Sequence, residues 1–180
     1  DVYKRQSYTF IKAQGGSIGK SLCEDDRQVY TLELIEKAKI KNVNLCLPLD
    51  NVIADDFSNY AKRRIVKSGE IPDDWEGLDI GPKSISTFQD IIKKSKTILW
   101  NGPLGVFEFQ NFAIGTEAIA EAVVNATQNG SFSLIGGGDS AAAINNLNYG
   151  NKVSYVSTGG GALLEYMEGK TLPGVAILEN

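Results

Sequence analysis

The sequence predicts an α/β fold built on a parallel β-sheet, for three reasons. Short apolar runs of strand length alternate with amphipathic stretches of helical length along most of the chain. Three of these runs lead directly into glycine-rich loops and then into another helical stretch. Strands separated by helices are joined by crossovers, which place the strands parallel in one sheet. A composition of 42% hydrophobic and 22% charged residues over 180 residues is typical of a globular domain with a sizeable core.

The first predicted unit is a helix followed by a strand. Apolar residues recur at helical spacing behind two acidic residues that can serve as N-caps: Val29, Leu32, Ile35 and Ala38 behind Asp25 and Asp26. The apolar run 43–47 comes next and is predicted to be a buried strand.

The stretch from Asp50 to Pro82 is less regular. Apolar positions continue through it at Val52, Ile53, Ile65, Val66, Leu78 and Ile80. The segment Ile71–Asp74 is typical of a turn. We therefore interpret this stretch as a small strand-rich excursion of the same domain rather than as a linker.

Two more helix-strand units and a final strand complete the pattern. Ser84 is the predicted N-cap of a helix with Phe88, Ile91 and Ile92 on one face, and the strand 97–100 follows it. Another helical face consists of Ile119, Ala122, Val123 and Ala126, ahead of a strand at 132–135. The last predicted strand covers 153–156.

Three glycine-rich loops carry the functional prediction. They follow apolar runs and cover residues 101–105, 136–140 and 157–161. Because the carboxyl ends of parallel strands meet at one edge of a sheet, we expect the loops to lie together. Glycines let a ligand approach the backbone, and the helix that follows directs free amides and a positive dipole end at an anion. Phosphate is therefore the expected ligand.

Asp139 and Ser140 directly follow the three glycines of the second loop. Taken alone, either residue is as readily explained as a helix N-cap, and each loop as a tight connection. A carboxylate beside a bound phosphate would repel it unless a divalent cation lay between them. The combination therefore predicts a site for a magnesium nucleotide.

Composition excludes several other functions. The chain has no His, which rules out a Ser-His-Asp or Cys-His nucleophile and a His-ligated zinc site within it. A net charge of −4 without a basic run argues against nucleic acid as a partner. No apolar stretch is long enough to span a membrane, and no signal-peptide pattern opens the sequence. Cys23 and Cys46 are too few for a disulfide framework, so we expect reduced packing thiols and a cytoplasmic location.

Two motif matches are rejected. The segment 14–21 fails the phosphate-binding pattern G-x-x-x-x-G-K-[ST] because Gln14 stands where Gly is needed, and no buried strand precedes it. We interpret it as a surface turn. Gly136, Gly138 and Ala141 fit the loose dinucleotide fingerprint, but no acidic residue about 20 positions later ends a strand.

Ordered short blocks run through residues 7–180. They are YTFIK (8–12), IGKS (18–21), LP (47–48), ADDF (54–57), GLDIGP (77–82), WNGP (100–103), GVFE (105–108), GGGDS (136–140), STGGGA (157–162) and LPGV (172–175). In this order they resemble the C-terminal, nucleotide-binding lobe of phosphoglycerate kinases. The resemblance implies a Rossmann-like lobe of three layers around a parallel sheet.

The resemblance also implies a role for each site residue. Asp139 would help to hold Mg²⁺ bound with ADP or ATP, and Gly137, Gly138 and Ser140 would cradle the phosphates. The remaining nucleotide contacts would be Glu108 to the ribose hydroxyls, Gly77 beside the adenine, and Asn101, Gly102 and Pro103 at the border of the nucleotide. The loop facing the transferred phosphoryl group would be Gly159, Gly160 and Gly161. Without the resemblance, Glu108 would be a solvated acid and Gly77 a turn glycine.

The implied activity is that of glycolytic phosphoglycerate kinase, a phosphotransferase with a carboxyl group as acceptor. It transfers a phosphoryl group reversibly between 1,3-bisphosphoglycerate with ADP and 3-phosphoglycerate with ATP, and the parent enzyme is expected to be a monomer. The family's N-terminal lobe, which binds phosphoglycerate, is absent here, as is the Gly-Ala-Lys segment upstream of residue 7. We therefore expect a partial lobe at 7–180, incomplete at its N-terminus and inactive alone. Residues 1–6 match nothing in the family and are predicted to be an artefact of cloning or sequence assembly.

Two alternatives remain at this point. The chain could be the dinucleotide-binding module of a dehydrogenase, which would prefer NAD to magnesium ADP. It could also be a catalytically silent remnant that serves only as a partner surface, in which case no nucleotide would bind.

Overall fold

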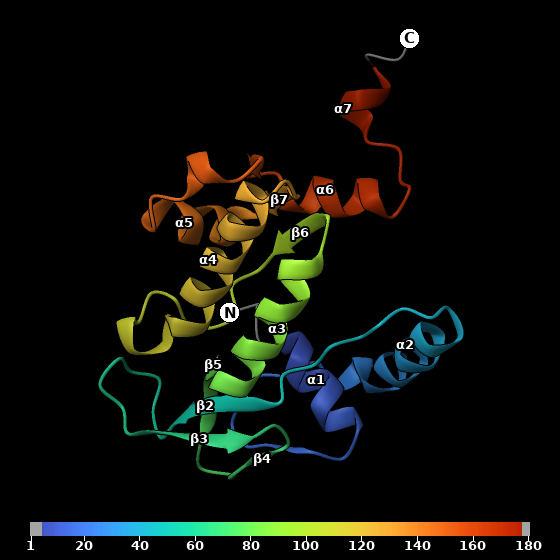
Figure 1. Ribbon diagram of the computed structural model, residues 1–180. Coiled ribbons are helices and arrows are strands. Elements are labelled where there is room, and N and C mark those ends of the chain that lie inside the picture. Colours follow the sequence, from blue (N-terminus) through green and yellow to red (C-terminus); the bar gives the residue numbers. More distant parts are fainter. Residues whose placement is uncertain (1–4, 178–180) are drawn as a thin grey trace. The chain divides into compact units, whose positions relative to one another are not determined.

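The computed structural model describes residues 5–177, and the chain divides into two compact units. Unit 1 contains the residues through Asp90 together with Leu104–Ile119, and unit 2 contains Ile91–Pro103 and the residues from Ala120 onward. Helices α3 (Pro82–Lys94) and α4 (Ile114–Gln128) each have residues in both units. Figure 1 labels the elements along the chain, from blue at the N-terminal end to red at the C-terminal end.

Unit 1 combines helices with short strands. Its elements are α1 (Arg5–Ala13), β1 (Ser17–Ile18), the 3₁₀ turn η1 (Asp25–Arg27), α2 (Gln28–Ile40), β2 (Asp50–Ala54), β3 (Arg63–Lys67), β4 (Glu70–Ile71), β5 (Glu76–Ile80) and the 3₁₀ turn η2 (Gln110–Phe112). Strand β2 lies between β3 and β5 and is antiparallel to both, while β1 pairs with β4 in parallel. The prediction that residues 50–82 are rich in strands is therefore confirmed.

Apolar side chains from distant parts of the sequence form the core of unit 1. One cluster joins α1 to the strands through Tyr8, Ile11, Ile18, Ile53 and Ile71. Helix α1 buries these side chains because Tyr8 and Ile11 are three residues apart and share one face. A second cluster joins Ala54 and Leu78 to Phe112, with Val106 and Phe109 packed against it. The loop after residue 104 is thereby held against β5.

Unit 2 contains the parallel sheet that the sequence predicts. Its elements are β6 (Thr97–Asn101), β7 (Phe132–Gly136), α5 (Gly138–Asn146), the 3₁₀ turn η3 (Gly150–Lys152), β8 (Tyr155–Ser157), α6 (Gly160–Met167) and α7 (Pro173–Ala176), with most of α4. The strands pair in parallel in the order β6-β7-β8. Strand β8 begins two residues later than predicted. The α/β class and the parallel sheet are confirmed.

The strand predicted at 43–47 is wrong. These residues form no strand, Val43 and Leu45 are exposed by 60% and 42%, and the next strand begins at Asp50. A strand needs a neighbour that pairs with its N–H and C=O groups, and no described strand lies beside this segment in a ladder. An apolar run by itself cannot indicate whether such a neighbour exists.

Helix α2 is confirmed, but its predicted caps are wrong, and Val29 and Leu32 of its apolar series are exposed. Asp25 and Asp26 lie in η1, and Arg27 occupies the N-cap position without a side-chain hydrogen bond. The Asp25 carboxylate instead accepts hydrogen bonds from Lys12 Nζ at 2.7 Å and Gln28 Nε2 at 2.8 Å. Val29 is 71% exposed, while Thr31 is buried. The contact between α1 and α2, rather than hydrophobic periodicity, decides which face is covered.

Ser84 is not the N-cap of α3, because it lies inside the first turn and is fully buried. The carboxylate of Asp50, at the start of β2, accepts hydrogen bonds from the amides of Lys83 at 3.1 Å and Ser84 at 2.8 Å. The Ser84 hydroxyl also donates to this carboxylate at 2.7 Å. A side chain 34 residues away thus caps the helix, which local sequence cannot reveal.

Four further features of the described residues concern segments and residue types that the sequence singles out. No helix within residues 5–177 has the length and hydropathy that a membrane span requires. Cys23 and Cys46 are free thiols. The segment 14–21 follows a helix rather than a strand. It contains β1 and the buried residues Ile18 and Ser21, so its interpretation as a surface turn is wrong in part. Of the predicted terminal segment 1–6, residues 1–4 lie outside the described residues, while Arg5 and Gln6 belong to α1. The assignment of 1–6 and 7–180 stays a prediction.

Candidate functional site

The three predicted loops leave the sheet of unit 2 at one edge. Asn101 ends β6, Gly136 ends β7 and Ser157 ends β8. The register pairs Asn101 with Gly136 and Gly136 with Ser157, so the three strands end side by side. This arrangement follows from the parallel pairing, because every crossover returns the chain to the same end of the sheet. Figure 1 labels β7, α5 and α6, whose colours follow one another along the sequence.

The first two loops are joined by hydrogen bonds. The amide of Gly102 donates to the Ser140 hydroxyl at 2.6 Å, and Trp100 Nε1 donates to the Gly102 carbonyl at 2.7 Å. Ser140 is 1% exposed and Trp100 is 7% exposed, so both contacts are shielded from water. In this conformation Ser140 connects the two loops.

The glycines of the second and third loops pack against each other. A Cβ atom on Gly160 would lie 2.6 Å from Gly137 Cα, and one on Gly137 would lie 2.8 Å from Asn101 Oδ1. Both distances are shorter than real Cβ contacts: a side chain on Gly160 would push backbone away and separate the loops, and one on Gly137 would displace the Asn101 amide group. Gly137 also has a φ of +91°, which favours glycine. The first, second and third loops therefore meet at Asn101, Gly137 and Gly160.

Helix α5 presents its N-terminus to this meeting point. Gly137 occupies the N-cap position and gives no side-chain hydrogen bond. The first intrahelical bond comes from Ala141 to the Gly137 carbonyl, so the earlier amides have no partner in the helix. Asp139 lies partly exposed in the first turn, and Gly138 has open space around it. This end of the helix combines free amides with one carboxylate.

Helix α6 begins in the same way at the end of the third loop. Gly159 is its N-cap residue and gives no side-chain bond, and the Gly159 amide donates to Ser157 Oγ at 3.3 Å. Gly159 and Gly161 are exposed, and a Cβ on Gly161 would meet no atom within 4 Å. Two helix N-termini therefore border the loop cluster of unit 2.

The predicted nucleoside contacts, Gly77 and Glu108, belong to unit 1. The segments that carry them lie side by side, because the amide of Val106 donates to the Leu78 carbonyl at 2.9 Å. Glu108 is exposed in the turn that follows. The other predicted site residues all belong to unit 2: Asn101, Gly102, Pro103 and the residues 137–140 and 159–161.

Position 77 requires glycine because the Tyr8 side chain occupies the space beside it. A side chain at Gly77 would overlap the Tyr8 hydroxyl, and the Gly77 amide donates to Ser21 Oγ at 2.9 Å. Burial raises the pKa of the Tyr8 phenol well above its usual value of 10, and the nearby negative charge of Asp79 raises it further. Tyr8 therefore remains neutral and fills the space that the missing side chain leaves. A contact between Gly77 and adenine stays a prediction.

The metal prediction rests on a single carboxylate. Among residues 5–177, no three His, Cys, Asp or Glu side chains gather as metal ligands. A magnesium ion bound with a nucleotide takes one or two carboxylates and completes its shell with phosphates and water. Asp139, beside free helix amides, fits that arrangement and does not fit a cage made by protein alone.

Sequence reasoning assigned no role to Asp79, although it lies inside the block 77–82. Its carboxylate is 2% exposed and accepts hydrogen bonds from the amides of Ile80 and Gly115, each at 2.8 Å. It thereby holds the first turn of α4 against β5. The partner amide is 36 residues away, so no local spacing could have revealed this role.

Comparisons with known proteins agree with this geometry. A sequence model of the family "Phosphoglycerate kinase" matches residues 6–170. The chain is 57% identical over 173 residues to the phosphoglycerate kinase of Porphyromonas gingivalis and 53% identical over 174 residues to that of Clostridioides difficile. These alignments cover 96% and 97% of this chain but 41% and 43% of the relatives. The chain thus spans less than half the length of the curated relatives that it matches.

Solved structures give the same assignment. The phosphoglycerate kinase structure from Coxiella burnetii aligns with a TM-score of 0.90 and 44% identity over 97% of this chain and 44% of that one. The crystal structure of the enzyme from Pyrococcus horikoshii aligns with a TM-score of 0.75 and 26% identity over 96% of this chain and 43% of that one. These matches do not favour the dehydrogenase alternative. Sequence blocks, parallel sheet and loop geometry agree, and the chain belongs to the phosphoglycerate kinase family.

Proposed function

We propose that this chain is the ADP- and ATP-binding part of a glycolytic phosphoglycerate kinase. The enzyme would transfer a phosphoryl group reversibly between 1,3-bisphosphoglycerate with ADP and 3-phosphoglycerate with ATP. The observation that carries the proposal is the register of Asn101, Gly136 and Ser157, which sends three glycine-rich loops from neighbouring strand ends. Such an edge, bordered by helix N-termini, suits a polyphosphate.

The phosphates are assigned to the start of α5. The uncapped N-terminus of this helix supports amide donation from Gly137, Gly138 and Ser140, with the Ser140 hydroxyl occupied by Gly102. Asp139 would hold magnesium, which neutralises phosphate charge when it is bound with the nucleotide. The carboxylate alone would repel the phosphates, so its place in the first turn supports a bound cation.

The remaining predicted residues are assigned to the nucleoside and to the border of the nucleotide. Glu108 is exposed and would accept hydrogen bonds from the ribose hydroxyls, since an ionised carboxylate is an acceptor only. Gly77 lies on the neighbouring segment and would border the adenine. Asn101, Gly102 and Pro103 would border the nucleotide from the first loop of unit 2.

The transfer step requires little acid–base chemistry. The acceptor carboxylate of phosphoglycerate is ionised at neutral pH and can attack phosphorus directly, which agrees with a chain that has no His. Catalysis then depends on positioning and on neutralising charge. Amides of Gly159, Gly160 and Gly161 would stabilise the phosphoryl group in transfer. We propose that phosphoglycerate binds outside these 180 residues and that the parent enzyme is a cytoplasmic monomer, consistent with free Cys23 and Cys46.

A calorimetric titration of the 180-residue chain tests the proposal. Magnesium ADP should bind saturably and NAD⁺ should not. Binding of NAD⁺ in preference to magnesium ADP would support the dehydrogenase alternative and contradict the proposal. If neither ligand bound to folded protein, the chain would be better explained as a silent partner surface.

A further inference from the structure

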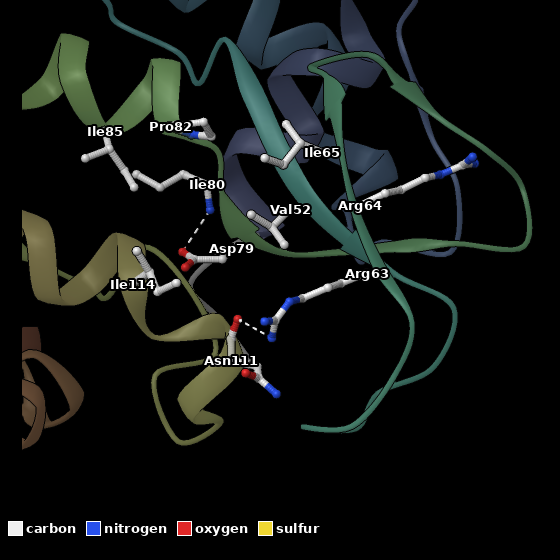
Figure 2. Close-up of a pocket in the computed structure, with 10 residues that line it drawn as sticks. All are labelled: Val52, Arg63, Arg64, Ile65, Asp79, Ile80, Pro82, Ile85, Asn111 and Ile114. Carbon is white, nitrogen blue, oxygen red and sulfur yellow. Dashed lines mark hydrogen bonds between the residues drawn. The ribbon is translucent and has the colours of Figure 1, made fainter.

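Unit 1 contains a pocket that neither Gly77 nor Glu108 lines. Its volume is about 420 Å³, which lies in the range of sites that bind small organic molecules. Strands β2, β3 and β5 and the first turns of α3 and α4 form its walls, as Figure 2 shows. All of its lining residues belong to unit 1, so its shape is set within that unit.

Half of the ten residues that line the pocket have branched aliphatic side chains. They are Val52, Ile65, Ile80, Ile85 and Ile114. Ile65 is 56% exposed and Ile114 is 57% exposed, although both line a concave surface. Covering such side chains removes apolar area from water, and the gain is proportional to the area covered. The pocket therefore favours a ligand with an apolar body.

Arg63 and Arg64 both line the pocket, but their guanidinium groups point in different directions (Figure 2). Arg63 Nη1 lies 3.5 Å from the main-chain oxygen of Asn111, a long contact that leaves most of its donors available. Within the part of the chain that the structure describes, Arg63 forms no ion pair. Figure 2 shows its side chain directed at Asn111, while Arg64 extends away from it. Arg64 stacks on Trp75, with Cζ 4.5 Å from the ring centroid.

The other charges around the pocket are already satisfied. Asp79 lines it, but its carboxylate is buried and holds the amides of Ile80 and Gly115. The N-terminus of α3 is likewise occupied by the Asp50 carboxylate. Neither helix N-terminus is therefore available to an anion, and Arg63 is the group that would attract one. A guanidinium binds a carboxylate through two parallel hydrogen bonds.

We propose that this pocket binds a small amphipathic carboxylate, with its apolar body between Ile65 and Ile114 and its carboxylate on Arg63. Such a ligand matches the two properties that the pocket combines, exposed aliphatic side chains and a guanidinium group without an ion pair among the described residues. None of the residues proposed to contact the nucleotide lines this pocket, and the proposal does not depend on them.

Octanoate is a suitable probe, and octanol and octylammonium have the same chain without the negative charge. An NMR titration of the full 180-residue chain should show saturable shifts of the Ile65 and Ile114 amides, with octanoate binding about tenfold more tightly than octanol. Octylammonium should bind most weakly. Equal affinity for octanoate and octanol, or the absence of saturable shifts, would overturn the proposal.

Two neighbouring arginines provide a matched pair of variants. Arg63→Gln should weaken the binding of octanoate about tenfold and leave the binding of octanol unchanged. Arg64→Gln loses the same charge and should leave the binding of octanoate unchanged. Ile65→Thr should weaken both ligands. Equal losses of octanoate affinity in Arg63→Gln and Arg64→Gln would show that only the net charge of the protein matters, and would refute the site. Magnesium ADP should not displace octanoate, and strict competition would also refute it.

Discussion

Contact between the second and third loops can be tested by adding a single methyl group. In Gly160→Ala, the new Cβ would lie 2.6 Å from Gly137 Cα and 2.9 Å from Gly137 N. Carbon atoms in contact are normally about 3.5 to 4.0 Å apart, so the loops must separate by about 1 Å. Overpacking of this kind costs about 1 to 3 kcal/mol of stability. Both contacts are with backbone, which cannot rotate away as a side chain can.

Gly161→Ala is the matched control, because Gly161 also lies in the first turn of α6 and a Cβ there meets nothing within 4 Å. Replacing glycine with alanine in a compatible backbone conformation stabilises the folded protein by about 0.4 to 1 kcal/mol, because the unfolded chain then has less conformational entropy. Both variants share that gain, so the difference between their free energies of unfolding isolates the steric clash. We expect Gly160→Ala to be less stable than Gly161→Ala by about 1 to 3 kcal/mol.

The two tryptophans allow unit 2 to be followed by itself. Trp75 belongs to unit 1, and Trp100 belongs to unit 2, where it is 7% exposed. In a Trp75→Phe background, fluorescence during urea unfolding reports the environment of Trp100. Gly160→Ala should lower the urea midpoint relative to Gly161→Ala. It should also weaken the binding of magnesium ADP, because the loops no longer meet. Identical midpoints for the two variants would refute the packing argument.

Four further outcomes are expected. Asp139→Ala should weaken magnesium ADP by about 1 to 3 kcal/mol and metal-free ADP much less, as calorimetry can measure, and equal losses would exclude a metal role. Glu108→Gln should weaken the binding of ADP more than the binding of 2′,3′-dideoxy-ADP. An identical loss of affinity for the two nucleotides would assign Glu108 a structural role. Because the pKa of Tyr8 is raised on folding, its contribution to stability is complete below the usual tyrosine pKa of 10 and is lost as pH rises above that value. Tyr8→Phe should therefore flatten the alkaline decline in the free energy of unfolding, and an unchanged slope would contradict the assignment. The 180-residue chain alone should show no ATP-dependent phosphorylation of 3-phosphoglycerate in a coupled assay, since orienting the acceptor supplies about 7 to 11 kcal/mol of the rate enhancement; turnover within tenfold of a full-length enzyme would refute this.

Local pattern predicted much of unit 2. Strands β6 and β7 and helix α4 were predicted from apolar runs and helical spacing, because a parallel sheet with crossover helices leaves strong local periodicity. Predictions that depended on a distant partner were less accurate. Residue type predicts Ser84 as the cap of α3, yet the Asp50 carboxylate performs that role from β2.

The sequence alone determined the fold class, the three strand-to-loop-to-helix connections and the family, because these depend on residue order and on periodicity along a continuous segment. Only the tertiary structure decided that residues 43–47 form no strand, that Gly77 accommodates Tyr8, and that Gly137 and Gly160 are needed for contact between loops. It also revealed the pocket beside Arg63, whose walls come from several separate elements. The physical reason is that pairing, burial and close approach are properties of two segments at once, and neither segment records the position of the other.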